Sequence, residues 1–301
     1  MAERRTDLEQ VEISFPAYAI PQILPWFARK QTAGNLYYQA AQTDATAQYN
    51  RNTASLASIT TNAMAAASTS FACAEIIQRE EMSYDQVMGY ADLAHAELAM
   101  ARKARRAFYN KVESLGISAI LTNAIDATSD PVAAVDSYAA KLADKAFGET
   151  ALVVSNHDFV ALKNNNIVKD RMKNTGIYLG YNGDPRSVTK EQLAAVFGVS
   201  RVIVGRDDLW YKSGYKGVGA VVVLPNADID PNEEVQLGRS IYFAYDSEAE
   251  HHIVESWYDE VAKAHAVDAV GLVDIKVLNS GLKQAITLFS VDQSGSESQS
   301  I

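Results

Sequence analysis

The chain has 301 residues, of which 48% are hydrophobic, and a formal net charge of −10. This length and apolar content suffice for the packed core of one large domain or two small ones, and the composition excludes a disordered chain. No apolar run approaches the roughly 18 residues that cross a bilayer, so we expect no membrane span. Residues 1–12 lack the apolar run of a signal peptide, so we expect no leader.

Two counts restrict the chemistry. The single cysteine, Cys73, excludes an intrachain disulfide and a cysteine-based metal site, and it fits a protein made in a reducing cytosol. Acidic residues outnumber basic ones by 37 to 27. Proteins that grip nucleic acid normally carry a basic face, so this balance disfavours tight, sequence-specific DNA binding. It suits a container for DNA and a soluble enzyme equally well.

The first 33 residues combine a polar start with an apolar stretch that prolines interrupt. Residues 1–13 show no periodicity and suit either a mobile or an ordered arm. Pro16, Pro21 and Pro25 lie in the apolar stretch 14–33, and prolines at this spacing exclude a helix interior. We therefore expect an extended segment that buries its aromatic side chains.

Residues 34–70 are rich in Ala, Thr, Ser, Gln and Asn, and Tyr37, Tyr38 and Tyr49 are nearly their only bulky side chains. Such a segment cannot bury enough apolar surface to hold itself in one conformation. It predicts a long extended hairpin, a linker, or a surface that a neighbour orders. Residues 71–77 then predict a returning strand.

A long helix is predicted from Tyr84 to about Val112, because its apolar residues recur at spacings of three and four. Ser83 and Gln86 form a capping box at its start, and Gly116 is placed to end it. A helix of this length spans roughly 45 Å. Basic residues gather near its predicted C-terminal end, where the helix dipole favours cations. They are Arg102, Lys103, Arg105, Arg106 and Lys111.

The rest of the chain alternates between helices and strands. Asp130 and Pro131 predict the start of a helix that ends at Gly148. Ser155 caps a short helix over 156–162, and Thr189 with Gln192 forms a capping box for 190–197. Strands are expected at 151–154, 199–204, 219–224, 240–245, 252–258 and 267–278, and a last short element at 282–288. The serine-rich tail 290–301 is expected to be disordered.

No motif for catalysis or cofactor binding stands out. The sequence has no phosphate-binding loop, no dinucleotide fingerprint and no nucleophile elbow, and the glycines between Gly214 and Gly219 have the spacing of a turn. His251 and His252 are adjacent, so on a strand they point to opposite faces, and they lack the spacing of zinc ligands. Asp207 and its neighbour Asp208 suit a solvated loop after a strand.

The remaining candidates are isolated side chains. His95 and His157 have no visible partner, and Cys73 suits a small buried hydrophobe better than a nucleophile. We therefore expect no catalytic residue, no cofactor and no metal.

The order of these elements resembles the major capsid proteins of tailed bacteriophages, which have the Hong Kong 97-type fold. Residues 34–81 resemble the extended loop of that family, and 84–112 its spine helix. Residues 151–162 and 188–205 resemble its axial region, and 240–288 the strands that complete its peripheral sheet. The resemblance covers most of the chain, but rests on the order of elements and not on a catalytic fingerprint.

The resemblance implies an α+β Hong Kong 97-type fold in six parts. These are an N-terminal arm (1–33), an extended loop (34–81), the spine helix and peripheral domain (82–150), an axial domain (151–238), a return to the peripheral domain (239–289) and a flexible tail (290–301).

The resemblance also implies a subunit that self-assembles through pentamers and hexamers into an icosahedral head. That head encloses the phage DNA without sequence-specific binding, and forms in the host cytoplasm as part of the virion. Scaffold, portal and decoration proteins are possible partners, and no membrane is involved. By analogy, Tyr37, Tyr38 and Tyr49 are expected as loop anchors. Arg102, Arg105 and Arg106 are expected to pair with another subunit.

Three alternatives remain open. An encapsulin-type nanocompartment shares the fold but packages protein. An α/β enzyme could use Asp207, Asp208 or His252, and would be a small monomer or dimer with a deep pocket. A tail or accessory virion protein would form tubes or rings of fixed size.

Overall fold

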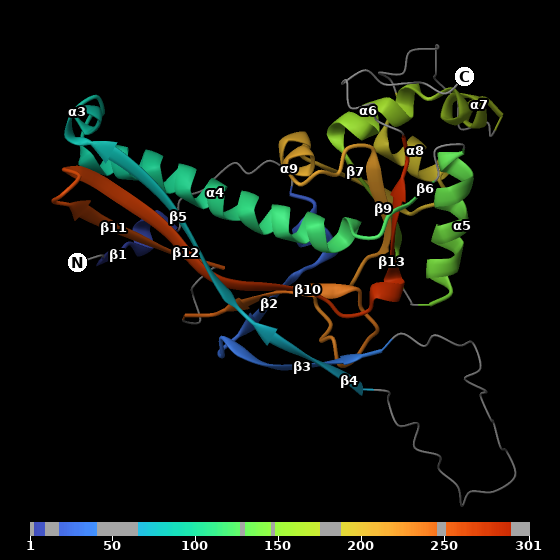
Figure 1. Ribbon diagram of the computed structural model, residues 1–301, viewed down its shortest axis with the longest axis horizontal. Helices are drawn as coiled ribbons and strands as arrows, with labels where there is room; N and C mark the ends of the chain where they lie inside the picture. Colours follow the sequence, from blue (N-terminus) through green and yellow to red (C-terminus); the bar gives the residue numbers. More distant parts are fainter. Residues whose placement is uncertain are drawn as a thin grey trace, which may run out of the picture.

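The computed structural model describes residues 3–9, 18–40, 66–126, 130–145, 148–174, 188–245 and 251–289. Two β-sheets and one long helix organise this part of the chain (Figure 1). None of the helices within these ranges is both long enough and apolar enough to span a membrane. The tail 290–301 and most of the expected loop, 41–65, lie outside the described residues.

The larger sheet has six strands in the order β1-β11-β12-β10-β2, and β5 pairs with β12 as well. All its pairs are antiparallel except β2 with β10. Its strands are β1 (Glu3–Arg4), β2 (Trp26–Arg29), β5 (Ala74–Ser83), β10 (Gly238–Phe243), β11 (Ile253–Asp259) and β12 (Ala264–Val277).

The smaller sheet has five strands in the order β6-β13-β9-β7-β8. The β7–β8 and β6–β13 pairs are parallel, and the other two are antiparallel. Its strands are β6 (Ile125–Asp126), β7 (Thr150–Ser155), β8 (Arg201–Gly205), β9 (Val218–Val223) and β13 (Lys283–Thr287). A separate hairpin pairs β3 (Ala33–Gln39) with β4 (Ala66–Ala72).

Helices surround both sheets. They are α1 (Thr6–Glu9), α2 (Ile20–Ile23), α3 (Tyr84–Val87), α4 (Leu93–Leu121), α5 (Pro131–Ala143), α6 (Asn156–Asn164), α7 (Asn166–Asn174), α8 (Lys190–Val196), α9 (Asp207–Lys212) and a 3₁₀ turn, η2 (Ser280–Leu282). The fold is therefore mixed α and β, as the sequence predicted.

Helix α4 joins the two cores. Its N-terminal half packs Met100 and Phe108 against the six-stranded sheet. Its last turns bury Ile117 and Leu121 with the apolar strands of the smaller sheet. Gly271 of β12 lies under this helix, where an added Cβ would come within 2.7 Å of the Phe108 ring. One rigid element thus fixes the sheets relative to each other (Figure 1).

Both expected ends of the long helix were wrong. The Ser83–Gln86 capping box forms, but it caps only the single turn α3. The long helix starts at Leu93, because the Asp92 side chain accepts a hydrogen bond from the His95 amide at 2.8 Å. It also continues through Gly116, where a Cβ would lie 2.5 Å from the Ile20 side chain. The basic residues are therefore in mid-helix, where the dipole does not favour them.

The structure also corrects four smaller expectations near the N-terminus and in the connections. The stretch 14–33 is not wholly extended, since Pro21 lies in the first turn of α2. Residues 71–77 are not one strand, because β4 ends at Ala72 and β5 begins at Ala74. Helix α5 ends at Ala143, before Gly148. Residues 207–208 form the first turn of α9 instead of a loop.

Other local predictions are confirmed. Asp130 caps α5, with Pro131 in its first turn. Ser155 caps α6, and the Thr189–Gln192 capping box starts α8. The six strands expected after residue 150 are present within a few residues of their predicted ends, and the last short element is the strand β13.

Candidate assembly surfaces

The hairpin β3–β4 is attached to the body at its base. Leu36 and Phe71 are buried against Ile241 of β10 and against Leu278, which directly follows β12. From this small cluster, the hairpin continues to its last described pair, Gln39 with Ala66 (Figure 1). Alternation along β3 leaves Tyr37 55% exposed, while Tyr38 is partly buried against the cluster. Tyr49 lies outside the described residues.

Polar contacts fix the far end of β3. The Gln39 amide donates to the Pro231 carbonyl at 2.9 Å, and the Gln39 carbonyl accepts from Asn279 Nδ2 at 3.0 Å. The same Asn279 amide donates to the Gln236 carbonyl at 2.7 Å. Asn279 is buried, so these bonds are shielded from water and set the direction in which the hairpin leaves.

The loop that receives Gln39 is held by one buried arginine. Arg239 donates to the carbonyls of Asn226 at 2.9 Å and Ala227 at 3.1 Å, and also to the Ile229 carbonyl and the Gln236 side chain. Burial lowers the pKa of Arg239, although Asp228 and Asp230 oppose this. A guanidinium supplies five donors, which suits it to fixing several carbonyls at once. Sequence reasoning missed Asn279 and Arg239, since neither has a local signal.

The basic stretch of α4 divides into two faces. Arg102, Lys103 and Arg106 are exposed. Arg105 is 3% exposed and lies inside the subunit, where it donates to His252 Nε2 at 2.8 Å and to the Leu8 carbonyl at 3.4 Å. Its position three residues before Phe108 on the buried face was a signal for this.

The two adjacent histidines pack inside the subunit. His251 stacks on Trp26 with ring centroids 4.1 Å apart, and burial lowers its pKa to about 4. Burial and the Arg105 charge lower the pKa of His252 to about 3. Both rings are therefore neutral at pH 7, and His252 accepts a hydrogen bond through Nε2. Among the described residues, no group of three acidic, cysteine or histidine side chains could hold a metal.

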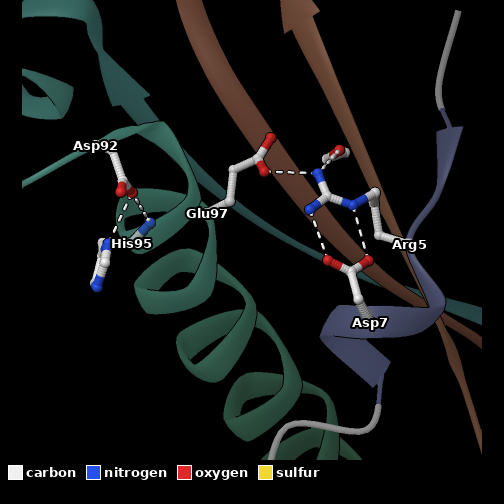
Figure 2. A network of polar contacts seen from close by, with 6 residues as sticks. Arg5, Asp7, Asp92, His95 and Glu97 are labelled. Atoms are coloured by element: carbon white, nitrogen blue, oxygen red, sulfur yellow. Dashed lines mark hydrogen bonds and ion pairs between the residues drawn. The ribbon is translucent and has the colours of Figure 1, made fainter.

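The N-terminal segment 3–9 is held against the six-stranded sheet. β1 is an edge strand of this sheet and pairs with β11, and Figure 2 shows Arg5 between Asp7 and Glu97. The Arg5 guanidinium lies 2.7 Å from Asp7 and 2.6 Å from Glu97, whose side chain is largely buried. Its hydrogen bonds lower the pKa of Asp7. The described part of the expected arm is thus ordered in this subunit.

A shallow hollow of about 540 Å³ lies where the parallel strands β7 and β8 end. Phe159, Lys190 and Arg206 line it together with Asp207 and Asp208. Asp207 accepts a hydrogen bond from the amide of His157, and Asp208 pairs with Arg206 at 2.8 Å. Both carboxylates are thus engaged in contacts within the chain, in the first turn of α9.

Comparison with known proteins gives a likeness in three dimensions. A phage-related protein from Bordetella bronchiseptica RB50 matches with a TM-score of 0.66 at 14% identity, over 96% of this chain and 98% of that one. The capsid of cyanophage P-SCSP1u matches with a TM-score of 0.56 at 10% sequence identity, over 92% of this chain and 90% of that one. The SrpI encapsulin from Synechococcus elongatus PCC 7942 matches with a TM-score of 0.51 at 9% sequence identity, over 96% of each chain.

No protein-family model and no curated protein matches the sequence. At these identities the structural likeness establishes the fold and nothing further. The chain has the Hong Kong 97-type capsid fold, which confirms the fold expected from the order of its elements.

Proposed function

We propose that this chain is the shell-building subunit of a tailed-phage head. The observation that carries the proposal is a hairpin, β3–β4, on a body with the capsid fold: its end at Gln39 is held against that body, yet Tyr37 stays 55% exposed. A subunit in solution gains little by presenting such an element, whereas a shell supplies a neighbouring surface for it. Heterologous contacts of this kind close into rings, here pentamers and hexamers.

The proposed parts follow the sheets. The peripheral domain is the six-stranded sheet with α4, and the axial domain is the five-stranded sheet with helices α5–α9. The proposed division moves residues 283–287 from the return at 239–289 to the axial domain, and the pairing of β13 with β9 supports this. Helix α5 contacts β9 and β7, so it too belongs there and not in the range 82–150. Residues 1–33 are the arm and 34–81 the extended loop, and these two parts contribute β1, β2 and most of β5 to the six-stranded sheet.

The side chains that we propose to contact other subunits lie on the surface of the subunit, or in the loop. Tyr37 is exposed on the hairpin, and Tyr38 supports it from the partly buried side. Tyr49 stays in the proposal through its place in the loop sequence. Arg102 and Arg106 offer charge on the surface of α4, whereas the buried Arg105 contributes by holding the subunit together.

The proposed setting is the virion, after synthesis in the host cytoplasm. The shell would enclose DNA without reading its sequence, in line with the acidic net charge. Portal, scaffold and decoration proteins are the partners that such a shell would meet. No catalytic role is proposed for the chain.

A deletion tests the proposal. Residues 40–65 are replaced by Asn-Gly, which joins Gln39 to Ala66, two residues that face each other in the hairpin. The shortened subunit should keep its circular dichroism spectrum and melting temperature, because its cores are untouched. It should elute as a monomer, while the full chain forms particles. Particles of normal size from the shortened chain would contradict the proposal.

The second candidate is a nanocompartment shell, because the fold is also similar to that of an encapsulin. Purified particles distinguish the two. Nuclease-protected DNA supports the phage head, and co-purifying protein cargo supports the compartment.

A further inference from the structure

One end of the molecule carries an unusual concentration of exposed apolar side chains. We call it the distal tip and define it as residues 84–93 and 258–263, which are α3, its connection to α4, and the turn between β11 and β12. Six of the ten large apolar side chains that are exposed in the described part of the chain lie there. They are Tyr84, Met88, Tyr90, Leu93, Tyr258 and Val261.

The two segments of the distal tip are neighbours in space. Ser83, which precedes α3, pairs with Ala264 at the start of β12. Tyr258 pairs with His265, and their rings lie 4.9 Å apart. Figure 1 shows α3 and the β11–β12 turn at the same end of the molecule, remote from the five-stranded sheet. The exposed apolar groups therefore gather at one end instead of scattering over the surface.

Exposure at the tip is too high to be part of the subunit core. Val261 is 96% exposed and Met88 is 67% exposed. A cluster of large apolar groups surrounded by polar residues marks a surface that another molecule covers. Within a single subunit, these side chains would cost free energy by remaining in water.

The charges around the tip indicate what covers it. The two segments hold four carboxylates and one lysine, Lys263. The carboxylates are Asp85, Asp92, Asp259 and Glu260. Two such tips would repel each other, so the tip fits a surface of opposite sign.

The chain itself carries such a surface. Arg102, Lys103 and Arg106 are exposed on α4, and residues three or four apart share one face of a helix. No ion pair joins any of these three to another described residue. The tip of the same subunit cannot reach them, because Leu93 and Arg102 belong to one rigid helix and are nine residues, or about 13 Å, apart along it.

We infer that the distal tip docks onto the basic face of α4 in a second copy of the chain, with Met88 and Val261 at the centre of the contact and its carboxylates against Arg102 and Arg106. This contact rests on the proposed shell function and names one of its interfaces. Apolar burial supplies affinity, and the charges fix which surface the tip meets.

Charge reversal with rescue tests the pairing. One variant carries Asp85→Lys and Glu260→Lys, a second carries Arg102→Glu and Arg106→Glu, and a third carries all four changes. Each side chain is exposed, so all three should fold and melt like the wild type. The assembled fraction is measured by sedimentation and negative-stain microscopy. We expect at least a tenfold loss in the first two variants and recovery of particles in the third.

Two further variants separate charge from size and apolar contact. Arg102→Lys with Arg106→Lys keeps the charge and should assemble. Met88→Ser with Val261→Ser keeps the charge but removes the apolar centre, and should fail to assemble. Normal assembly of either charge-reversed variant, or failure of the fourfold variant to recover, would overturn the inference while the wild type still forms shells. Absence of particles from the wild type would overturn the proposed function as well.

Discussion

Replacing Glu113 by glutamine should remove a pH dependence from the stability of the subunit. Glu113 lies on α4, is 1% exposed, and accepts hydrogen bonds from the amides of Ala19 at 2.8 Å and Ile20 at 3.0 Å. Burial raises its pKa from 4.5 to about 7, although the two amides and Arg206 oppose the shift. The carboxyl group therefore both anchors the N-terminal segment and titrates near neutral pH.

The sign follows from proton uptake. Between pH 4.5 and 7 the folded state holds a proton that the unfolded state has released, so this contribution is fully present below pH 4.5. It is lost as pH rises through 7. Between pH 5 and pH 8, the loss of unfolding free energy amounts to about 2.5 kcal/mol, at 1.36 kcal/mol per pKa unit. Glutamine cannot titrate, so the wild-type advantage over Glu113→Gln should shrink by about that amount.

Urea unfolding of the unassembled subunit, followed by tryptophan fluorescence at pH 5 and pH 8, measures this difference. Glu233→Gln is the matched control, because it makes the same chemical change at a side chain that is exposed to solvent. A difference between wild type and Glu113→Gln that stays constant over this range would refute the reasoning. It would mean that Glu113 is ionised throughout, and that its two amide donors outweigh burial.

Two further outcomes follow from buried polar groups. The pKa values of His251 and His252 are lowered to about 4 and 3, so below pH 6.5 the folded state binds fewer protons than the unfolded state. The stability that these two neutral rings contribute above pH 6.5 should therefore fall as the pH drops below it. Thermal melts from pH 7 to pH 4 measure this loss, and His252→Gln should reduce it. Asn279→Ala should cost about 1–3 kcal/mol. Loss of its bond to the Gln39 carbonyl should loosen this end of β3 and so speed exchange of the Gln39 amide, which bonds to Pro231. Unchanged exchange would refute the anchoring role.

Local signals predicted much of the fold. A cap is formed by residues within three positions of each other, so the Thr189 and Asp130 caps could be recognised from sequence. The start of the long helix could not, because Ser83 and Asp92 are both N-caps and the apolar spacing continues between them. Gly116 suggested a helix end, yet it is needed for the close approach of Ile20. That contact is tertiary and leaves no trace in the local sequence.

The assembly surfaces were harder to predict. Met88 falls within the helix predicted over 84–112, whereas the break before α4 leaves its side chain exposed. Arg105 could have been separated from Arg102 and Arg106 by helical periodicity, because it shares the face of Phe108. Asn279 and Gln39 are 240 residues apart, and no spacing rule connects them.

Negative-stain electron microscopy of the purified full-length chain tests the shell-building claim most directly. We expect closed, icosahedral particles of uniform diameter, built from this chain alone or after its co-expression with a scaffold protein. A population that remains monomeric or dimeric under both conditions, at concentrations well above those in which phage heads form, would contradict it.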